Sequence, residues 1–98
     1  MWVISWAKCR EFAELHLDAL EPLARWYDLT ERARWERFAD VRNTFGKTVD
    51  RVGECYVFDI HGGHYRLIAK ISKPWKKVWI RHVLTHREYD LGKWEEDC

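Results

Sequence analysis

The chain has 98 residues, of which 47% are hydrophobic and 34% are charged, and its formal net charge is +1 at pH 7. This length supports one domain with a modest core, and the mixture of apolar and charged residues excludes a disordered chain. No apolar run approaches the roughly 18 residues that a membrane span needs, and we see no signal peptide at the start. We therefore predict a single domain over residues 1–98 of a cytoplasmic protein that does not bind membranes.

The cysteines favour reduced thiols. Cys9, Cys55 and Cys98 are odd in number and far apart, and none of them stands in a CxxC or CxxH spacing. That pattern argues against a disulfide framework and against a zinc knuckle. We therefore expect no metal site and no cofactor built on these residues.

The first half of the chain is predicted to be helical after one short strand. Residues 2–5 (WVIS) are the strand candidate. Apolar residues at helical spacing then predict a helix over about residues 6–17, with the Ser5 hydroxyl as its N-cap. Asp18 is the expected cap of a second helix, which ends near residue 32.

A third helix is predicted over residues 38–45, where large apolar residues recur every three or four positions. Gly46 would end it in a left-handed conformation. The helical part then covers about residues 6–45. Residues 47–53 are expected to be a linking loop, with at most a fragment of strand.

The second half is predicted to be a sheet over about residues 54–85. Strands at residues 55–60 and 65–71 flank His61-Gly62-Gly63-His64, in which the glycine pair favours a tight hairpin. This turn fixes a register that places Ile60 opposite Tyr65, Phe58 opposite Leu67, Asp59 opposite Arg66 and Val57 opposite Ile68. A second hairpin through residues 72–77 would place Ile71 opposite Val78, Lys70 opposite Trp79, Ile68 opposite Arg81 and Arg66 opposite Val83.

Alternation along these strands gives the sheet two different faces. The face under the helices would carry Tyr56, Phe58, Ile60, Tyr65, Leu67, Ala69, Ile71, Val78, Ile80 and Leu84. The other face would be open and would carry Asp59, Arg66, Lys70, Trp79 and Arg81. The expected fold is α+β, with N-terminal helices packed on one face of a small, mainly antiparallel sheet.

The open face has the composition of a polyanion-binding surface. Residues 61–87 hold seven Lys or Arg, four His and no Asp or Glu, so the neutral net charge hides a basic region. Arginine offers paired donors to phosphate, and an exposed tryptophan offers a plane on which a base can stack. The simpler alternative is a solvated strand face, which is common in small domains.

Five stretches carry a resemblance to a known family: MWVIS, ARWY, ADVRNTF, YVFDIHGGHYRLIAKI and VWIRHVLTHREYD. Together, over residues 1 to about 90, they resemble the HigB-type toxins of bacterial type II toxin–antitoxin modules, within the RelE-like superfamily of mRNA interferases. Two features depart from that family. Asp59 stands where an asparagine is expected, and the short acidic end (residues 94–98) of the C-terminal tail (residues 86–98) is unassigned.

The resemblance implies a RelE-like fold and a ribosome-dependent endoribonuclease that cuts mRNA. Such an enzyme would use no metal and no cofactor, because the 2′-OH beside the scissile phosphate attacks in line. Its implied partners are the ribosome, mRNA and a neutralising helix-turn-helix antitoxin of the HigA type.

That chemistry needs cations on the phosphate and groups that move two protons. Arg66 and Arg81 would hold phosphate oxygens, while His86 and Tyr89 would transfer protons. Asp90 would orient His86. The residues expected to bind RNA or its phosphates are Lys70, Lys73, Lys76, Lys77, Trp79 and Arg87. Asp59 would influence Arg66 from the neighbouring strand.

Each of these residues has a simpler alternative role. Arg66 would pair with Asp59 across the hairpin, and Tyr89 would pack its ring locally. His82 is predicted on the core face as a satisfied histidine, while His61 and His64 are predicted as turn residues. Two other functions also fit the basic face: a non-catalytic RNA-binding module, and an interaction domain that docks an acidic protein.

Overall fold

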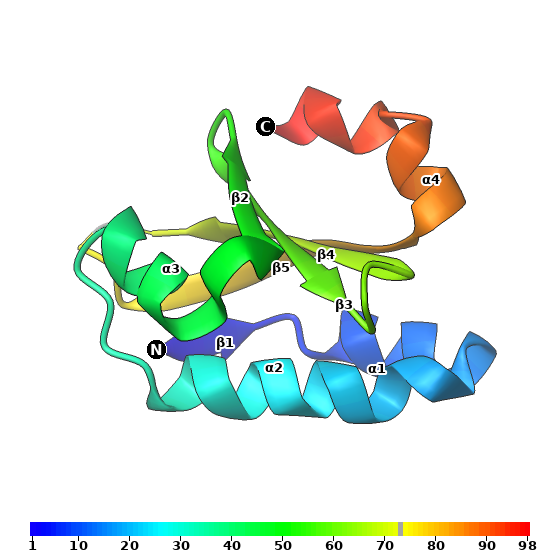
Figure 1. Cartoon of the computed structure of the whole chain (residues 1–98), viewed down its shortest axis with the longest axis horizontal. Helices are drawn as coiled ribbons and strands as arrows, with labels where there is room; N and C mark the ends of the chain where they lie inside the picture. Colours follow the sequence, from blue (N-terminus) through cyan, green and yellow to red (C-terminus); the bar gives the residue numbers. More distant parts are fainter. Residues whose placement is uncertain (73) are drawn as a thin grey trace.

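The computed structural model describes residues 1–72 and 74–98 and shows an α+β domain, which confirms the predicted fold class (Figure 1). The predicted contact at Lys73 lies outside the described residues. In chain order the elements are β1 (Trp2–Ile4), α1 (Ala7–Leu15), η1 (Leu17–Ala19), α2 (Leu20–Arg32), α3 (Phe38–Phe45), η2 (Gly46–Thr48), β2 (Val49–Val52), β3 (Cys55–Ile60), β4 (Tyr65–Ile71), β5 (Lys77–Thr85), α4 (His86–Asp90) and η3 (Lys93–Asp97). No helix among the described residues is long and apolar enough to cross a membrane.

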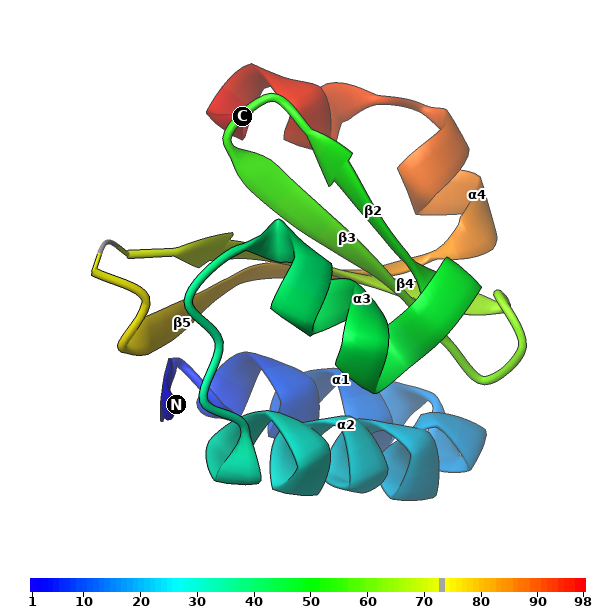
Figure 2. The same cartoon turned by 60° about the vertical axis from the view of Figure 1, so that its left-hand side comes forward.

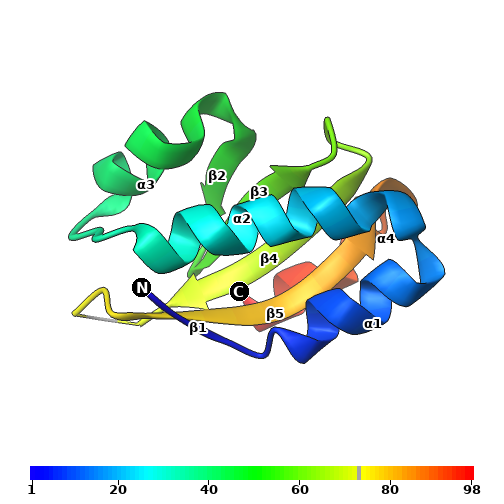
Figure 3. The ribbon, with the colours of Figure 1, turned by 90° about the horizontal axis from the view of Figure 1, so that it is seen from below.

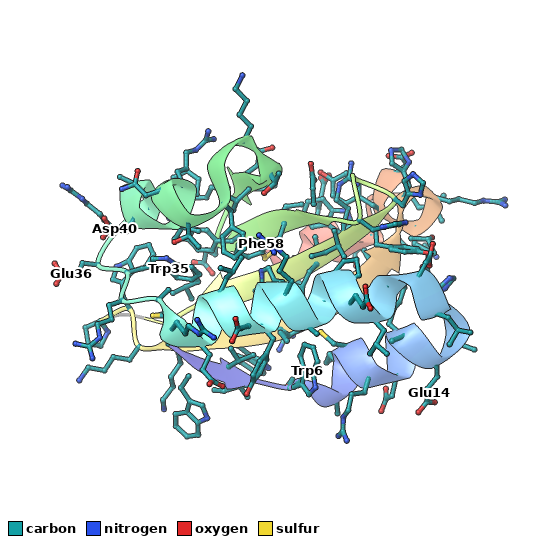
Figure 4. The ribbon with its side chains drawn as sticks, turned by 60° about the horizontal axis from the view of Figure 1, so that its bottom comes forward. Trp6, Glu14, Trp35, Glu36, Asp40 and Phe58 are labelled. Carbon is teal, nitrogen blue, oxygen red and sulfur yellow. A yellow bond between two sulfur atoms is a disulfide. The ribbon has the colours of Figure 1, made fainter. Side chains whose placement is uncertain are left out.

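The helices α1 and α2 lie side by side across one face of the sheet (Figure 3). Leu23 and Trp26 face the sheet from α2, and the Trp26 ring meets the edge of Phe58 at 5.4 Å between centroids. Trp35 and Phe58 both point into the layer between these helices and the sheet (Figure 4). This layer holds the main core, which buries the apolar sides of β3, β4 and β5.

The third helix begins and ends where the sequence predicts, and Gly46 follows it with a φ of 62°. Both predicted N-caps are wrong. Ser5 has a φ of 72° and makes no side-chain cap, so α1 begins one residue later, after Trp6. Asp18 lies in the 3-10 turn η1 and instead accepts a hydrogen bond from the Tyr65 hydroxyl at 2.5 Å.

The sheet has the strand order β1-β5-β4-β3-β2. The predicted β3–β4 register is confirmed from Tyr56 opposite Ala69 to Ile60 opposite Tyr65. Two strands join its edges. Part of the predicted linking loop forms β2, antiparallel to β3, and β1 pairs in parallel with β5.

A β-bulge changes the second half of β5. The β4–β5 pairing follows the prediction from Ile71 opposite Val78 to Lys70 opposite Trp79, and then shifts between Ile68 and Ala69. Ile68 therefore faces His82, and Arg66 faces Leu84. The predicted partners Arg81 and Val83 are wrong because the extra residue of a bulge reverses the alternation beyond it.

The bulge moves two side chains to the other face. His82 and Leu84 were expected under the helices, but both lie on the face that carries Lys70 and Arg66. Val83 takes the core position instead. The consequence is that a histidine joins the basic face directly beside Arg81.

The predicted open face is largely covered by the tail, residues 86–98, which lies opposite the helical layer (Figures 1 and 2). Thr85 starts α4 with a capping box, in which its hydroxyl accepts from Glu88 N and the Glu88 carboxylate accepts from Thr85 N. Trp94 is 5% exposed and packs on Val57 and Ile68. The expectation of an uncovered face is therefore wrong, because these apolar side chains form a second, smaller core with the tail.

A disulfide joins Cys55 on β3 to Cys98 in the tail, with 5.3 Å between their Cα atoms. The expectation of three reduced thiols is wrong for this pair, because the tail folds back across 43 residues of sequence and brings the two cysteines together. Cys9 is free and buried, and its burial raises the pKa of the thiol to about 12.

Candidate functional site

Two cationic side chains and a histidine of the covered face converge on one carboxylate of the tail. Arg81 donates from Nε to Asp97 Oδ2 at 2.6 Å and from a terminal nitrogen to Asp97 Oδ1 at 3.1 Å. Lys70 Nζ lies 3.6 Å from Oδ1. His82 Nε2 lies 3.2 Å from Oδ2, although it makes no hydrogen bond there. We call Lys70, Arg81 and His82 the anion cradle.

The cradle stabilises a negative charge. The pKa of the Asp97 carboxyl lies below its usual range, chiefly because Arg81 donates hydrogen bonds to it. Burial acts in the opposite direction, and electrostatic attraction by Arg81, Lys70 and His82 lowers the pKa further. Arg81 is further fixed by Trp79, whose ring centre lies 4.3 Å from the guanidinium carbon. The cradle is thus a partly buried site that can bind two oxygens of one anion.

Arg66 belongs to a second group on the same face. Its Nε lies 3.1 Å from Asp59 Oδ1, and a terminal nitrogen donates to the Gly63 carbonyl. The Arg66 guanidinium carbon also lies 4.9 Å from the ring centre of Tyr89, which stacks on Trp94 at 5.0 Å between centroids. The Arg66 side chain is 15% exposed and is held on three sides.

A shallow groove of about 620 Å³ runs beside Arg66. It is lined by Asp59, Gly62, Gly63, His64, Tyr65, Arg66, Thr85, His86 and Arg87. His86 is anchored at this groove because its backbone amide donates to the His64 carbonyl at 3.0 Å. Asp90 Oδ2 lies 2.8 Å from His86 Nδ1, which leaves Nε2 as the nitrogen available to a ligand.

The predicted site residues therefore fall into two groups. The structure brings Lys70 to Arg81, and it brings Tyr89 to Arg66. It does not bring Arg66 and Arg81 to one anion, since Ile68 lies between their positions on the sheet and packs against Trp94.

Two other predicted lysines lie away from both groups. Lys76 and Lys77 are at the far hairpin beside β1, where Lys77 Nζ lies 5.0 Å from the ring centre of Trp2. Arg87 is exposed at the groove. The lysine pair would therefore meet a different part of a long ligand than the anion cradle does.

His82 and Asp97 are the site residues that sequence reasoning missed. No local pattern in β5 indicates the bulge, so the parity argument places His82 on the wrong face. Asp97 had a usable signal. Three of the last four residues are acidic, and an acidic segment that follows an acid-free basic stretch is suited to fold onto it.

His61 and His64, which flank the turn between β3 and β4, make local contacts. His61 Nε2 lies 3.5 Å from Asp18 Oδ2, and the rings of His61 and His64 meet at 5.0 Å. The Asp18 carboxylate raises the pKa of the Tyr65 hydroxyl, chiefly through their hydrogen bond. Among the described residues no three His, Cys, Asp or Glu side chains are grouped as metal ligands.

A comparison with known protein families identifies the family of this chain. Residues 19–92 match the family model described as HigB toxin, the RelE-like toxic component of a toxin–antitoxin system. The chain belongs to this HigB toxin family. The match covers most of the chain, including the anion cradle and the Arg66 groove, but it ends before Asp97.

Individual HigB relatives match over a shorter stretch. The chain is 42% identical over 36 residues to the mRNA interferase toxin HigB of Escherichia coli strain K12. The mRNA interferases HigB of Escherichia coli O157:H7 and Shigella flexneri match with the same identity and length. These alignments cover 37% of this chain and 35% of each relative, so the chain spans about a third of the curated relatives it matches.

Proposed function

We propose that this chain is the toxin of a type II toxin–antitoxin system and cuts mRNA as a ribosome-dependent endoribonuclease. The observation that carries the proposal is the anion cradle, in which Arg81 presents two parallel donors to a bound carboxylate. A phosphodiester offers two non-bridging oxygens with similar spacing and charge. Family membership and the mRNA interferase activity named for the relatives supply the chemical context.

The reaction requires no metal in this proposal. The 2′-oxygen attacks the neighbouring phosphorus, the bond from phosphorus to the 5′-oxygen breaks, and a 2′,3′-cyclic phosphate forms. Arg81 and Lys70 would stabilise the extra charge on the phosphate oxygens. Arg66 and Arg87 would hold flanking phosphates along the groove.

Proton transfer is assigned to two side chains of the Arg66 group, which lies on the same face of the sheet as the cradle. His86 presents Nε2 while Asp90 holds Nδ1, which suits a group that accepts or donates a proton near neutral pH. The Tyr89 hydroxyl is the second candidate, since its ring lies beside Arg66, with 4.9 Å between the guanidinium carbon and the ring centre. The proposed protein partner is a helix-turn-helix antitoxin of the HigA type.

The test is induced expression of Arg81→Ala in a growing bacterial culture. Removing a donor that stabilises transition-state charge costs about 100-fold to 1,000-fold in rate, so growth arrest should be lost. Primer extension on a translated mRNA should show discrete breaks for the wild type and none for this variant. Arg10→Ala is the matched control, because Arg10 is exposed on α1, in the opposite layer. Equal growth arrest by wild type and Arg81→Ala would refute the assignment.

A non-catalytic RNA-binding module is the second candidate. One observation favours it: Arg66 and Arg81 each already hold a carboxylate of the chain itself. In that case a translated mRNA would bind without being cut, and primer extension would show no breaks even when complexes form.

A further inference from the structure

The end of the tail occupies the anion cradle. We propose that residues 95–98 are a built-in plug, in which Asp97 takes the position of the RNA phosphate and the Cys55–Cys98 disulfide latches it, so that reduction opens the site. This inference rests on the proposed function and adds its regulation. It concerns residues beyond the part of the chain that the family model matches.

The Asp97 carboxylate is chemically similar to the phosphate that it would replace. Asp97 accepts two hydrogen bonds from Arg81 and lies within 3.6 Å of Lys70 and 3.2 Å of His82. A carboxylate bound in this bidentate manner uses the same donors that a phosphate would use. RNA and Asp97 therefore compete for one set of cations, and both cannot be bound at once.

Few contacts hold the last turn. Beyond the ion pairs of Asp97, its described attachments are the disulfide, a hydrogen bond from Glu54 N to Cys98 O at 3.1 Å, a 4.0 Å contact between Cys55 Sγ and the Asp97 carbonyl oxygen, and packing of Cys98 at the edge of the second core. Gly53 permits this approach, because a Cβ built on it would lie 2.6 Å from Cys98 O. Loss of the covalent link leaves the turn held by exchangeable contacts alone.

The plug can leave while the tail before it stays anchored. Trp94 is buried, stacks on Tyr89 and donates from Nε1 to the Tyr89 carbonyl at 2.9 Å. It therefore anchors the chain just before the plug. Only the residues after Trp94 need to move to uncover Arg81 and Lys70. Cys98 then leaves the edge of the second core, while Trp94, Val57 and Ile68 stay packed.

Reduction follows ordinary thiol–disulfide exchange with a dithiol reductant. Cys98 is half-buried whereas Cys55 is fully buried, so a reductant thiolate attacks the Cys98 sulfur and Cys55 leaves as a thiolate that takes up a proton. The second thiol of the reductant then displaces Cys98, which gives two protein thiols and an oxidised reductant. Cys9 takes no part, because its buried thiol stays protonated at neutral pH.

A disulfide in this position suits a switch better than a permanent brace. In compartments that keep thiols reduced, the disulfides that do form in most organisms are transient and redox-sensing. A toxin that acts on translated mRNA would work in such a compartment. Oxidised protein would be held closed, and reduced protein would be open.

The experiment measures binding of a short single-stranded RNA with 2′-deoxy substitutions, which cannot be cut by 2′-OH attack. Fluorescence anisotropy at fixed salt gives the dissociation constant for wild type, oxidised and reduced, and for oxidised Asp97→Asn and Glu96→Gln. Glu96 is exposed in the same turn, so Glu96→Gln changes the net charge equally without touching the cradle. Cys98→Ser provides a chain that cannot be latched.

A tethered competitor acts at an effective concentration on the order of millimolar, so its release should strengthen RNA binding about tenfold or more. We expect this gain for reduced wild type, for Cys98→Ser in either redox condition and for Asp97→Asn, but not for Glu96→Gln. Equal affinity of oxidised and reduced wild type would overturn the latch. Equal affinities of Asp97→Asn and Glu96→Gln would overturn the plug.

Failure of the proposed function has a different signature. If reduced protein binds the blocked RNA more tightly but never cuts a translated mRNA, the plug stands and the nuclease assignment fails. If oxidised and reduced protein cut that mRNA at the same rate, the nuclease stands and the plug fails. If no form binds the blocked RNA, the plug fails, and cleavage of the translated mRNA alone decides the nuclease assignment, because the proposed enzyme acts on the ribosome.

Discussion

Arg66 illustrates how one neighbouring side chain sets the availability of a cation. Its Nε lies 3.1 Å from Asp59, and that carboxylate is 40% exposed, so the pair is partly screened by water. An incoming phosphate must displace Asp59 or share the guanidinium with it. The negative charge at residue 59 would therefore oppose the proposed binding of RNA at the groove without blocking it.

Replacing Asp59 with Asn should increase cleavage or leave it unchanged. The amide still accepts a hydrogen bond from Arg66 but no longer competes by charge, so we expect up to about a tenfold gain in cleavage rate at low salt. Quantitative primer extension with reduced protein measures the rate. Asp50→Asn is a suitable control, because Asp50 pairs with Arg42 on the surface away from the groove. A marked loss of cleavage in Asp59→Asn would show that this carboxylate has a direct role.

At the scale of single residues, the sequence predicts the members of the site better than their partners. Arg66 and Arg81 were correctly placed on one face, because hairpin turns and strand alternation determine which way a side chain points. Their partners were harder to predict. Asp97 reaches Arg81 through a chain reversal, for which the acidic composition of the last residues is the one signal. His82 reaches Asp97 through a bulge that has no local signature.

At the scale of elements, periodic segments were predicted well and their ends poorly. The strands Cys55–Ile60 and Tyr65–Ile71 and the helix Phe38–Phe45 have the predicted bounds, since alternation and helical spacing reflect burial directly. The two predicted N-caps failed for different reasons. Asp18 bonds Tyr65 across the domain, whereas Ser5 has a left-handed backbone and α1 begins after Trp6.

The tail is the element whose docking should depend on pH through Asp97. The folded pKa of this carboxyl is lowered, so its contribution to docking is present above its unfolded pKa of about 3.9 and is lost as the pH falls through the lower folded value. Oxidised Asp97→Asn should be less stable to urea than wild type at pH 7 by about 1 kcal/mol, a modest value because the pair is partly exposed.

That difference should begin to shrink once the pH falls below about 4, because the unfolded chain takes up the proton first. It should vanish below the folded pKa, where protonated Asp97 and Asn are alike in charge. Urea unfolding of both proteins between pH 7 and pH 3 gives the comparison. Glu96→Gln should track wild type throughout. A difference between wild type and Asp97→Asn that is the same at every pH would indicate a steric effect of the substitution in place of the ionic contact.

At the scale of the whole molecule, the sheet separates two layers with different tasks. The helical layer buries the main core, whereas the tail layer buries a smaller apolar group around Trp94 and also covers the cations. The main core therefore lies on one face of the sheet, and the cations of the candidate site lie on the other (Figure 2). A change in the last turn of the tail can uncover the anion cradle without weakening the packing of α1 and α2.

Hydrogen exchange of oxidised and reduced protein tests this separation directly. Reduction should remove protection from the amides of Glu54 and Cys98, because their hydrogen bonds tie the last turn together and to the β2–β3 turn. The amides of α1, α2 and β4 should keep their protection, since the main core does not include the tail. Cys98→Ser should show the reduced pattern in both redox conditions. If reduction instead increased exchange across the helices and the sheet, the disulfide would be a brace for the entire domain, and release of the plug could not occur as a local event.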